Sequence, residues 1–161
     1  MLELMLKTTS IFCLITIIVQ DFKERNVYAW LFICLGIILS FLYLSESYTK
    51  LHLINIGINI SIVLFIIGIL YLYAKIKLKQ SLHSALGLGD LLFFMIIAIS
   101  FPIATFIILF SFSLLFALVV FLFIKKSLIE KSVPLAGLQA LFFLLIFSIN
   151  WSFELINLYA L

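Results

Sequence analysis

The chain has 161 residues, of which 66% are hydrophobic and 11% are charged, and its net charge is +3. Soluble domains contain about 45–50% apolar and about 25% charged residues, so this composition excludes a soluble globular protein and indicates an integral membrane protein. The charge gives no reason to expect a nucleic-acid partner. Cys13 and Cys34 lie inside apolar segments and form neither a C-x-x-C pair nor a disulfide framework.

Six apolar segments are predicted to form membrane helices, each of which needs about 20 residues. In chain order they comprise residues 4–20, 27–44, 51–73, 91–101, 103–124 and 135–150. No small-x-small cleavage site follows the first segment, so we interpret it as a retained helix rather than a signal peptide. Residues 151–161 are expected to extend the last helix or to lie along the membrane surface. The sequence therefore predicts an all-α, polytopic membrane bundle that forms one domain over residues 1–161.

The run from Leu91 to Ile124 is almost uninterrupted apolar sequence. A helix of about 34 residues would be about 51 Å long, whereas the hydrocarbon core is about 30 Å thick. Two helices must share the run, and Pro102 places the turn between them, because proline disfavours helix for the residue before it. The first of the two is short and is expected to begin before Leu91.

Basic residues predict the orientation of the bundle. Eight of the ten lie in the first, third and fifth links, namely Lys23, Arg25, Lys75, Lys77, Lys79, Lys125, Lys126 and Lys131. Cytoplasmic loops carry an excess of Lys and Arg, so these links are assigned to the cytoplasm and both termini to the outside. The sequence thus predicts a multi-pass protein of the inner (cell) membrane.

The chain has two aspartates, and each stands at the end of an apolar run. Asp21 begins a polar turn over residues 21–26, and Asp90 follows two glycines in Gly87-Leu88-Gly89-Asp90. Aspartate is costly near a membrane, and the predicted topology puts both on the cytoplasmic face. Two simpler interpretations remain open: Asp90 as a helix cap, and Asp21 as a solvated turn residue.

Two carboxylates a few ångströms apart share one proton, because both cannot ionise easily. The charged partner can take a proton from water as that water attacks a peptide carbonyl, and the neutral partner can hydrogen-bond the carbonyl oxygen. This chemistry needs no metal or cofactor.

Two motifs resemble the type IV prepilin leader peptidase family, membrane aspartic proteases with archaeal preflagellin relatives. The segment Asp21-Phe-Lys23-Glu24-Arg25-Asn-Val27 resembles the family's D-x-K-x-R-x-I-P-N, and Gly87-Leu-Gly89-Asp90 resembles its G-x-G-D. Val133-Pro134-Leu-Ala-Gly137 is a weaker match to the family's I-P-F-G-P. The order of the motifs and the predicted six-helix layout extend the resemblance over nearly the whole chain.

The resemblance implies an aspartic endopeptidase that cleaves the basic leader of type IV prepilin-like precursors at the cytoplasmic membrane face. Asp21 and Asp90 match the catalytic aspartates, and Gly87 and Gly89 match the glycines that position the backbone. Residues that are candidates for substrate binding or site support are Lys23, Glu24, Arg25 and Pro134. No metal and no cofactor are expected, and the expected partners are the precursor substrate and the lipid bilayer. The N-terminal methyltransferase-type domain of many bacterial members is not expected here.

Three positions depart from the family pattern. Tyr28 and Ala29 replace its proline and asparagine, and Leu92 replaces a lysine two places after the second aspartate. These departures leave open a catalytically degenerate homologue that acts as a non-enzymatic membrane assembly factor. A presenilin or signal-peptide-peptidase-like enzyme also uses GLGD, but it is expected to have nine helices and a different first motif.

Overall fold

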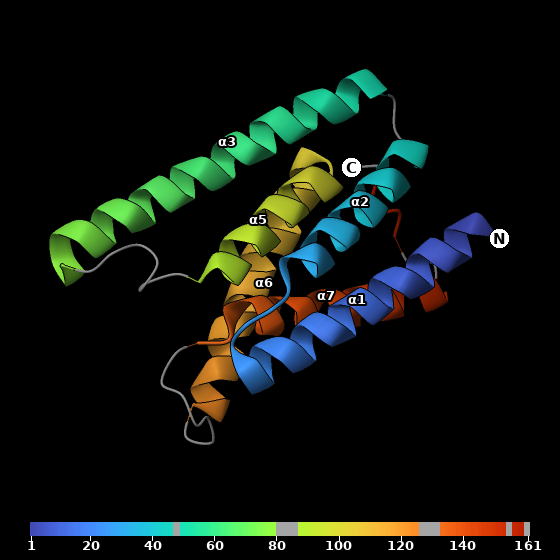
Figure 1. The fold of residues 1–161 in the computed structure, drawn as a ribbon. Coiled ribbons are helices and arrows are strands. Elements are labelled where there is room, and N and C mark those ends of the chain that lie inside the picture. Colours follow the sequence, from blue (N-terminus) through green and yellow to red (C-terminus); the bar gives the residue numbers. More distant parts are fainter. Residues whose placement is uncertain (47–48, 80–86, 126–132, 154–155, 160–161) are drawn as a thin grey trace.

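A computed structural model describes residues 1–161 except 47–48, 80–86, 126–132, 154–155 and 160–161. Within the described part, the chain folds into α-helices joined by short connections (Figure 1). Their bounds are α1 Leu2–Glu24, α2 Ala29–Glu46, α3 Thr49–Tyr73 with a π-helical extension η1 Ala74–Leu78, α5 Leu88–Ser100, α6 Ile103–Ile124 and α7 Leu135–Phe153. The predicted all-α class is therefore confirmed.

In the described part of the chain, five helical segments are long and apolar enough to cross a membrane, and they contain α1, α2, α3, α6 and α7. The apolar helix α5 has only 13 residues. At 1.5 Å per residue its length is about 20 Å, less than the hydrocarbon core of about 30 Å. This agrees with the prediction that the fourth helix is short, begins before Leu91 and ends just before Pro102.

Two predicted boundaries were wrong. Asp21 does not begin a polar turn, because α1 continues through Glu24 and ends at Arg25, whose φ is 53°. Lys75 and Lys77 lie on η1 rather than in a loop, and the helix ends at Lys79. Hydropathy marks where a helix leaves the apolar layer, but Lys and Glu are good helix formers, so a helix can continue beyond that point.

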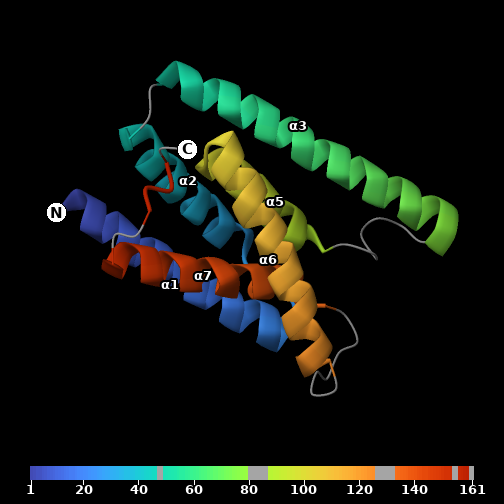
Figure 2. The same ribbon diagram turned by 180° about the vertical axis from the view of Figure 1, so that it is seen from behind.

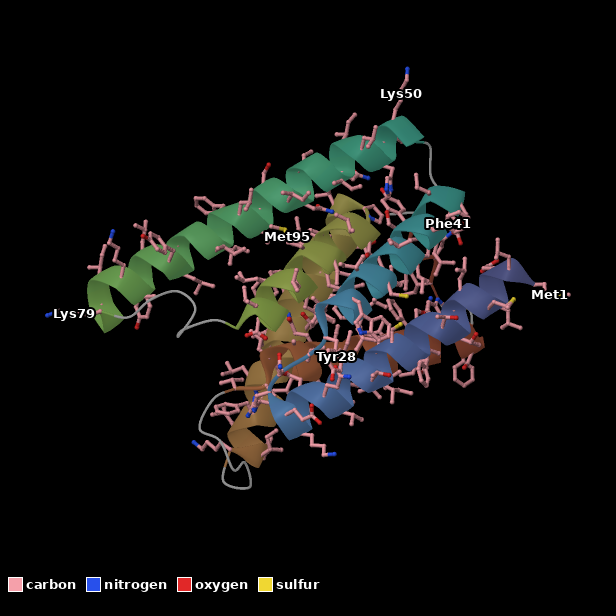
Figure 3. The ribbon with its side chains drawn as sticks, viewed as in Figure 1. Met1, Tyr28, Phe41, Lys50, Lys79 and Met95 are labelled. Atoms are coloured by element: carbon pink, nitrogen blue, oxygen red, sulfur yellow. The ribbon has the colours of Figure 1, made fainter. Side chains whose placement is uncertain are left out.

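The helices form a bundle with α3 on its outside. α7 packs along α1, α2 packs between α1 and α5, and α3 lies over α5 and the adjoining part of α6 (Figures 1 and 2). Figure 3 shows Lys79 at one end of the structure and Met1 and Lys50 at the opposite end. The carboxyl end of α1 and the amino ends of α5 and α7 meet at the end nearer Lys79 (Figure 1).

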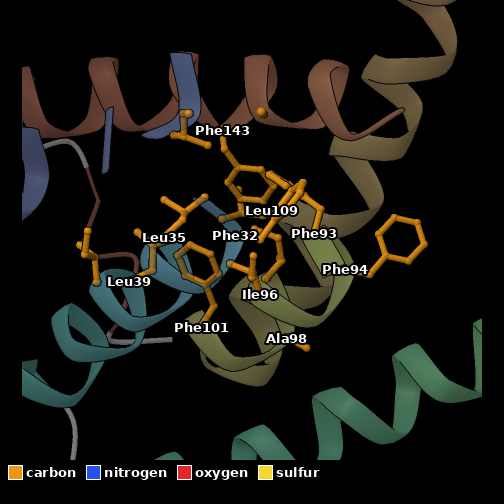
Figure 4. Packing of buried hydrophobic residues seen from close by; sticks show 14 of the residues in the cluster. Phe32, Leu35, Leu39, Phe93, Phe94, Ile96, Ala98, Phe101, Leu109 and Phe143 are labelled. Atoms are coloured by element: carbon orange, nitrogen blue, oxygen red, sulfur yellow. The ribbon is translucent and has the colours of Figure 1, made fainter. Parts of the chain in front are cut away.

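Aromatic side chains fill the centre of the bundle. Phe32 of α2 meets Phe93 of α5 edge-on, with ring centroids 6.4 Å apart, and Phe93 packs against Phe143 of α7 at 5.9 Å (Figure 4). All three rings are fully buried. Because these rings come from three helices, they fix how α2, α5 and α7 pack together.

The turn between α5 and α6 is stabilised by a side chain of α3. Phe101 is extended, as expected before Pro102, so the last carbonyls of α5 lack helical partners. The buried Asn59 amide donates to the carbonyls of Ala98 at 3.0 Å and Phe101 at 2.9 Å. The polar face of the third helix therefore caps α5 and holds α3 against the bundle.

Candidate active site

Asp21 belongs to the buried stripe of α1. The buried residues of this helix are Ser10, Cys13, Leu14, Ile17 and Asp21. Spacings of three and four residues place them on one face, so Asp21 continues the apolar stripe at the end of the helix. It is only 9% exposed, which excludes the alternative of a solvated turn residue.

Asp90 occupies the first turn of α5. Gly87 caps this helix, and its backbone N–H donates to Oδ2 of Asp90 at 3.2 Å. A carboxylate at the third helical position that binds the cap amide is one half of a capping box. The interpretation of Asp90 as a helix-capping residue is therefore correct, but it accounts for only one of its two carboxylate oxygens.

The amino-terminal turn of α7 connects the two acids. The Ala136 N–H donates to Oδ1 of Asp90 at 2.8 Å, and the Gly137 N–H donates to Oδ2 of Asp21 at 2.6 Å. The first amides of a helix have no intrahelical partner, and the helix dipole favours negative charge at this end. Successive amides of one helix end thus hold one oxygen of each carboxylate.

The neighbouring amides of α7 are bound to its own entry segment. The Leu135 N–H donates to the Val133 carbonyl at 2.9 Å, and the Leu138 N–H donates to the Pro134 carbonyl at 2.9 Å. Pro134 is buried and has no N–H of its own. Of the first four helical amides, only those of Ala136 and Gly137 therefore point at the acids.

Arg25 adds positive charge to the site. It ends α1, and its charge opposes the rise that burial causes in the pKa of Asp90. The carboxylates in turn lie near enough for the charge of Asp21 to act on Asp90. Two acids with one cation and backbone donors form a site that can hold one proton and one negative charge.

The other predicted site residues divide into two groups. Gly89 lies against Phe32 and Ala136, where a Cβ atom would meet their side chains at 3.5 and 3.8 Å. Pro134 directly precedes α7, next to the acids. Lys23 and Glu24, in contrast, are exposed on the last turn of α1.

Two of the three positions that depart from the family pattern have described contacts. The Tyr28 backbone N–H donates to Oε1 of Gln20 at 3.1 Å, which ties the link after α1 back to that helix. Leu92 lines an apolar groove of about 530 Å³ between α2, α3 and α5, together with Phe32 and Met95. Among the described residues, no group of three or more His, Cys, Asp and Glu side chains is placed to hold a metal ion.

Sequence reasoning missed Ala136 and Gly137 as parts of the site. Both contribute a backbone amide, and residue type says little about which amide a helix end presents. The signal that could have found them is Val133-Pro134-Leu-Ala-Gly137, where a proline before an apolar run predicts a helix start.

Fold and site together define a multi-pass membrane protein with a pair of buried or half-buried carboxylates at one end of its bundle. The family model of the type IV leader peptidase family matches residues 9–123, which include both aspartates. The chain belongs to this family of membrane peptidases. No curated protein and no solved structure was found to match the chain. The α7 residues that bind the two acids lie outside the matched stretch.

Proposed function

We propose that the protein is an aspartic endopeptidase that cleaves the basic leader of type IV prepilin-like precursors, with Asp21 and Asp90 as its catalytic residues. The observation that carries this proposal is that both acids bind successive amides of α7, in a chain of the leader peptidase family. Carboxylates that are held together in this way are suited to general acid–base work on one bond.

In the proposed mechanism the pair starts with a single shared proton. The ionised carboxylate accepts a proton from water while the water oxygen attacks the scissile carbonyl carbon, and the protonated carboxyl donates to the carbonyl oxygen. Collapse of the tetrahedral intermediate breaks the C–N bond, and the carboxyl that took the water proton passes it to the leaving amine. At the same time a hydroxyl of the intermediate returns a proton to the other carboxylate as the product carboxyl group forms, so the pair again holds one proton. The chemistry is complete with two carboxyl groups and water.

The proposed reaction takes place at the cytoplasmic face of the cell membrane. Basic residues support this placement, because six of those described lie on the last turn of α1 or just after α1, α3 and α6, at the end of the bundle where the carboxyl end of α1 meets α5 and α7. They are Lys23, Arg25, Lys75, Lys77, Lys79 and Lys125. Lys126 and Lys131, which were used for the same prediction, lie outside the described residues. By the positive-inside rule this end faces the cytoplasm, where an untranslocated basic leader is available.

Cleavage of a prepilin-like precursor by the purified protein tests the proposal. Wild-type protein is expected to shorten the precursor by its leader, whereas Asp21→Asn and Asp90→Asn are expected to leave it intact while accumulating normally in the membrane. Glu46→Gln, which neutralises an exposed acid at the end of α2, is the matched control and should cleave normally. Normal cleavage by either asparagine variant would refute the assignment, and an inactive wild type would favour a non-enzymatic assembly role.

A further inference from the structure

We propose that Gly137 is a positioning residue of the active site, because its N–H orients Asp21 and its missing side chain leaves room for that acid. The inference rests on the proposed function in one respect only, namely that the two carboxyl groups react with substrate. The hydrogen bonds themselves can be tested without substrate. Gly137 lies beyond the residues that match the family model, so its role is argued from contacts alone.

Contact between α1 and α7 is unusually close at this point. A Cβ atom on Gly137 would lie 2.9 Å from Oδ2 of Asp21, 3.0 Å from Cβ of Asp21 and 3.1 Å from Cδ2 of Phe22. Contacts below about 3.4 Å between such atoms require something to move. Rotation of the Asp21 side chain cannot relieve the contact with its Cβ, because that atom is fixed to the backbone of α1. Alanine at position 137 must therefore push α1 and α7 apart.

Such a displacement would separate the two acids. Ala136, one residue earlier on the same rigid helical turn, holds Asp90 through its N–H. If α7 moves away from α1, the 2.6 Å bond to Asp21 lengthens while Asp90 stays with α7. Catalytic geometry is sensitive at this scale, since a misplacement of about 1 Å can lower a rate about 10²-fold.

Other glycines in the same chain supply matched controls. At Gly57 and Gly68 of α3, an added Cβ atom would meet nothing within 4 Å. Alanine is the better helix former, so Gly57→Ala and Gly68→Ala should accumulate at least as well as wild type and keep its activity. Gly137→Ala applies the same chemical change at the tight contact.

The activity test compares these three variants on a prepilin-like precursor. Gly137→Ala is expected to lower kcat about 10²-fold with little change in KM, because the substrate-binding surfaces are not altered. The acidic limb of its pH–rate profile should move to higher pH, because the hydrogen bond from the residue 137 N–H, which stabilises the ionised carboxylate of Asp21, is weakened. Wild-type kcat and an unshifted profile in Gly137→Ala would overturn the inference.

Amide NMR on the protein in detergent micelles tests the arrangement without any substrate. In wild-type protein, the amide nitrogens of Gly137 and Ala136 should both shift as the carboxylates titrate. Asp21→Asn should abolish the shift at Gly137 and preserve one at Ala136, and Asp90→Asn should do the reverse. The inference would be overturned if the two amide shifts do not change with pH, or if both follow the titration of the same aspartate. This holds even if the protein is an active peptidase. An inactive wild type with the crossed pattern would refute the proposed function alone.

Discussion

Asp21 near the carboxyl end of α1 and Asp90 in the first turn of α5 are bound by successive residues of a third helix, at 2.6 and 2.8 Å. The acids are far apart in the sequence, and neither helix alone determines their separation. The α7 end does so, because its amides share one rigid turn. The geometry of the pair therefore depends on how three helices pack, and it should respond to changes at their contacts.

A pair that shares one proton should lose function as a unit. Asp21→Asn and Asp90→Asn should each lower kcat by about 10³-fold or more, and the double variant should be no slower than the worse single variant. Effects of residues that act together are strongly non-additive, because removing one already abolishes the common step. Single-turnover cleavage assays on the three variants measure this, and independent, multiplying losses would contradict a shared mechanism.

The proton requirement also predicts a bell-shaped pH–rate profile for wild-type protein. The acidic limb reports loss of the ionised base, and the alkaline limb reports loss of the protonated acid. Arg25→Gln should move the profile to higher pH, because burial already raises the pKa of Asp90 and this variant removes the cation that opposes the rise. Lys23→Gln removes an exposed charge from the same helix end and should leave the profile near that of wild type. If the pH–rate profile of Arg25→Gln, like that of Lys23→Gln, matches the wild-type profile, then Arg25 acts only on topology.

Much of the fold could be predicted from the sequence because membrane helices must be long and apolar. The break at Pro102 and the early start of α5 followed from helix length against bilayer thickness and from the backbone preference before proline. The end of α1 could not be located in this way. Hydropathy falls at Asp21, but α1 continues to Glu24, and Asp21 therefore stays on the buried face of the helix, where it binds Gly137 of α7.

For the candidate site, the sequence predicted the acidic side chains but not the backbone amides that bind them. The two aspartates and the glycines before Asp90 stand out because acids and flexible residues are unusual next to apolar runs. The binding of both acids by Ala136 and Gly137 depends on the packing of α7 against α1, and this information is tertiary. The position of Arg25 relative to Asp90 is tertiary information as well, since from the sequence alone a cation beside a membrane helix is explained equally well by topology.

Asn55 and Asn59 of α3 both hydrogen-bond to neighbouring helices. Asn59→Leu should destabilise the protein by about 1–2 kcal/mol, because two carbonyls at the end of α5 lose their donor. Ser61→Ala, an exposed site on the same helix whose hydroxyl bonds within α3, should change stability by less than about 0.5 kcal/mol. Thermal unfolding in detergent measures both. Equal stability of the two variants would mean that the cap contributes little to holding α3.

The two glycines before Asp90 should not be equally important. An added Cβ on Gly87 would lie 3.3 Å from Oδ2 of Asp90, whereas one on Gly89 would make only ordinary contacts, the nearest at 3.5 Å from Phe32. Gly87→Ala should therefore displace the carboxylate and lower kcat about tenfold, a loss of about 1.4 kcal/mol in transition-state stabilisation. Gly89→Ala should lower kcat less than threefold, because α5 can accept it without moving Asp90. Cleavage kinetics at matched protein levels decide between them. If Gly89→Ala instead lowers kcat more than Gly87→Ala does, the substrate must occupy the place beside Gly89 that the added Cβ fills. The substrate backbone would then lie against the first turn of α5.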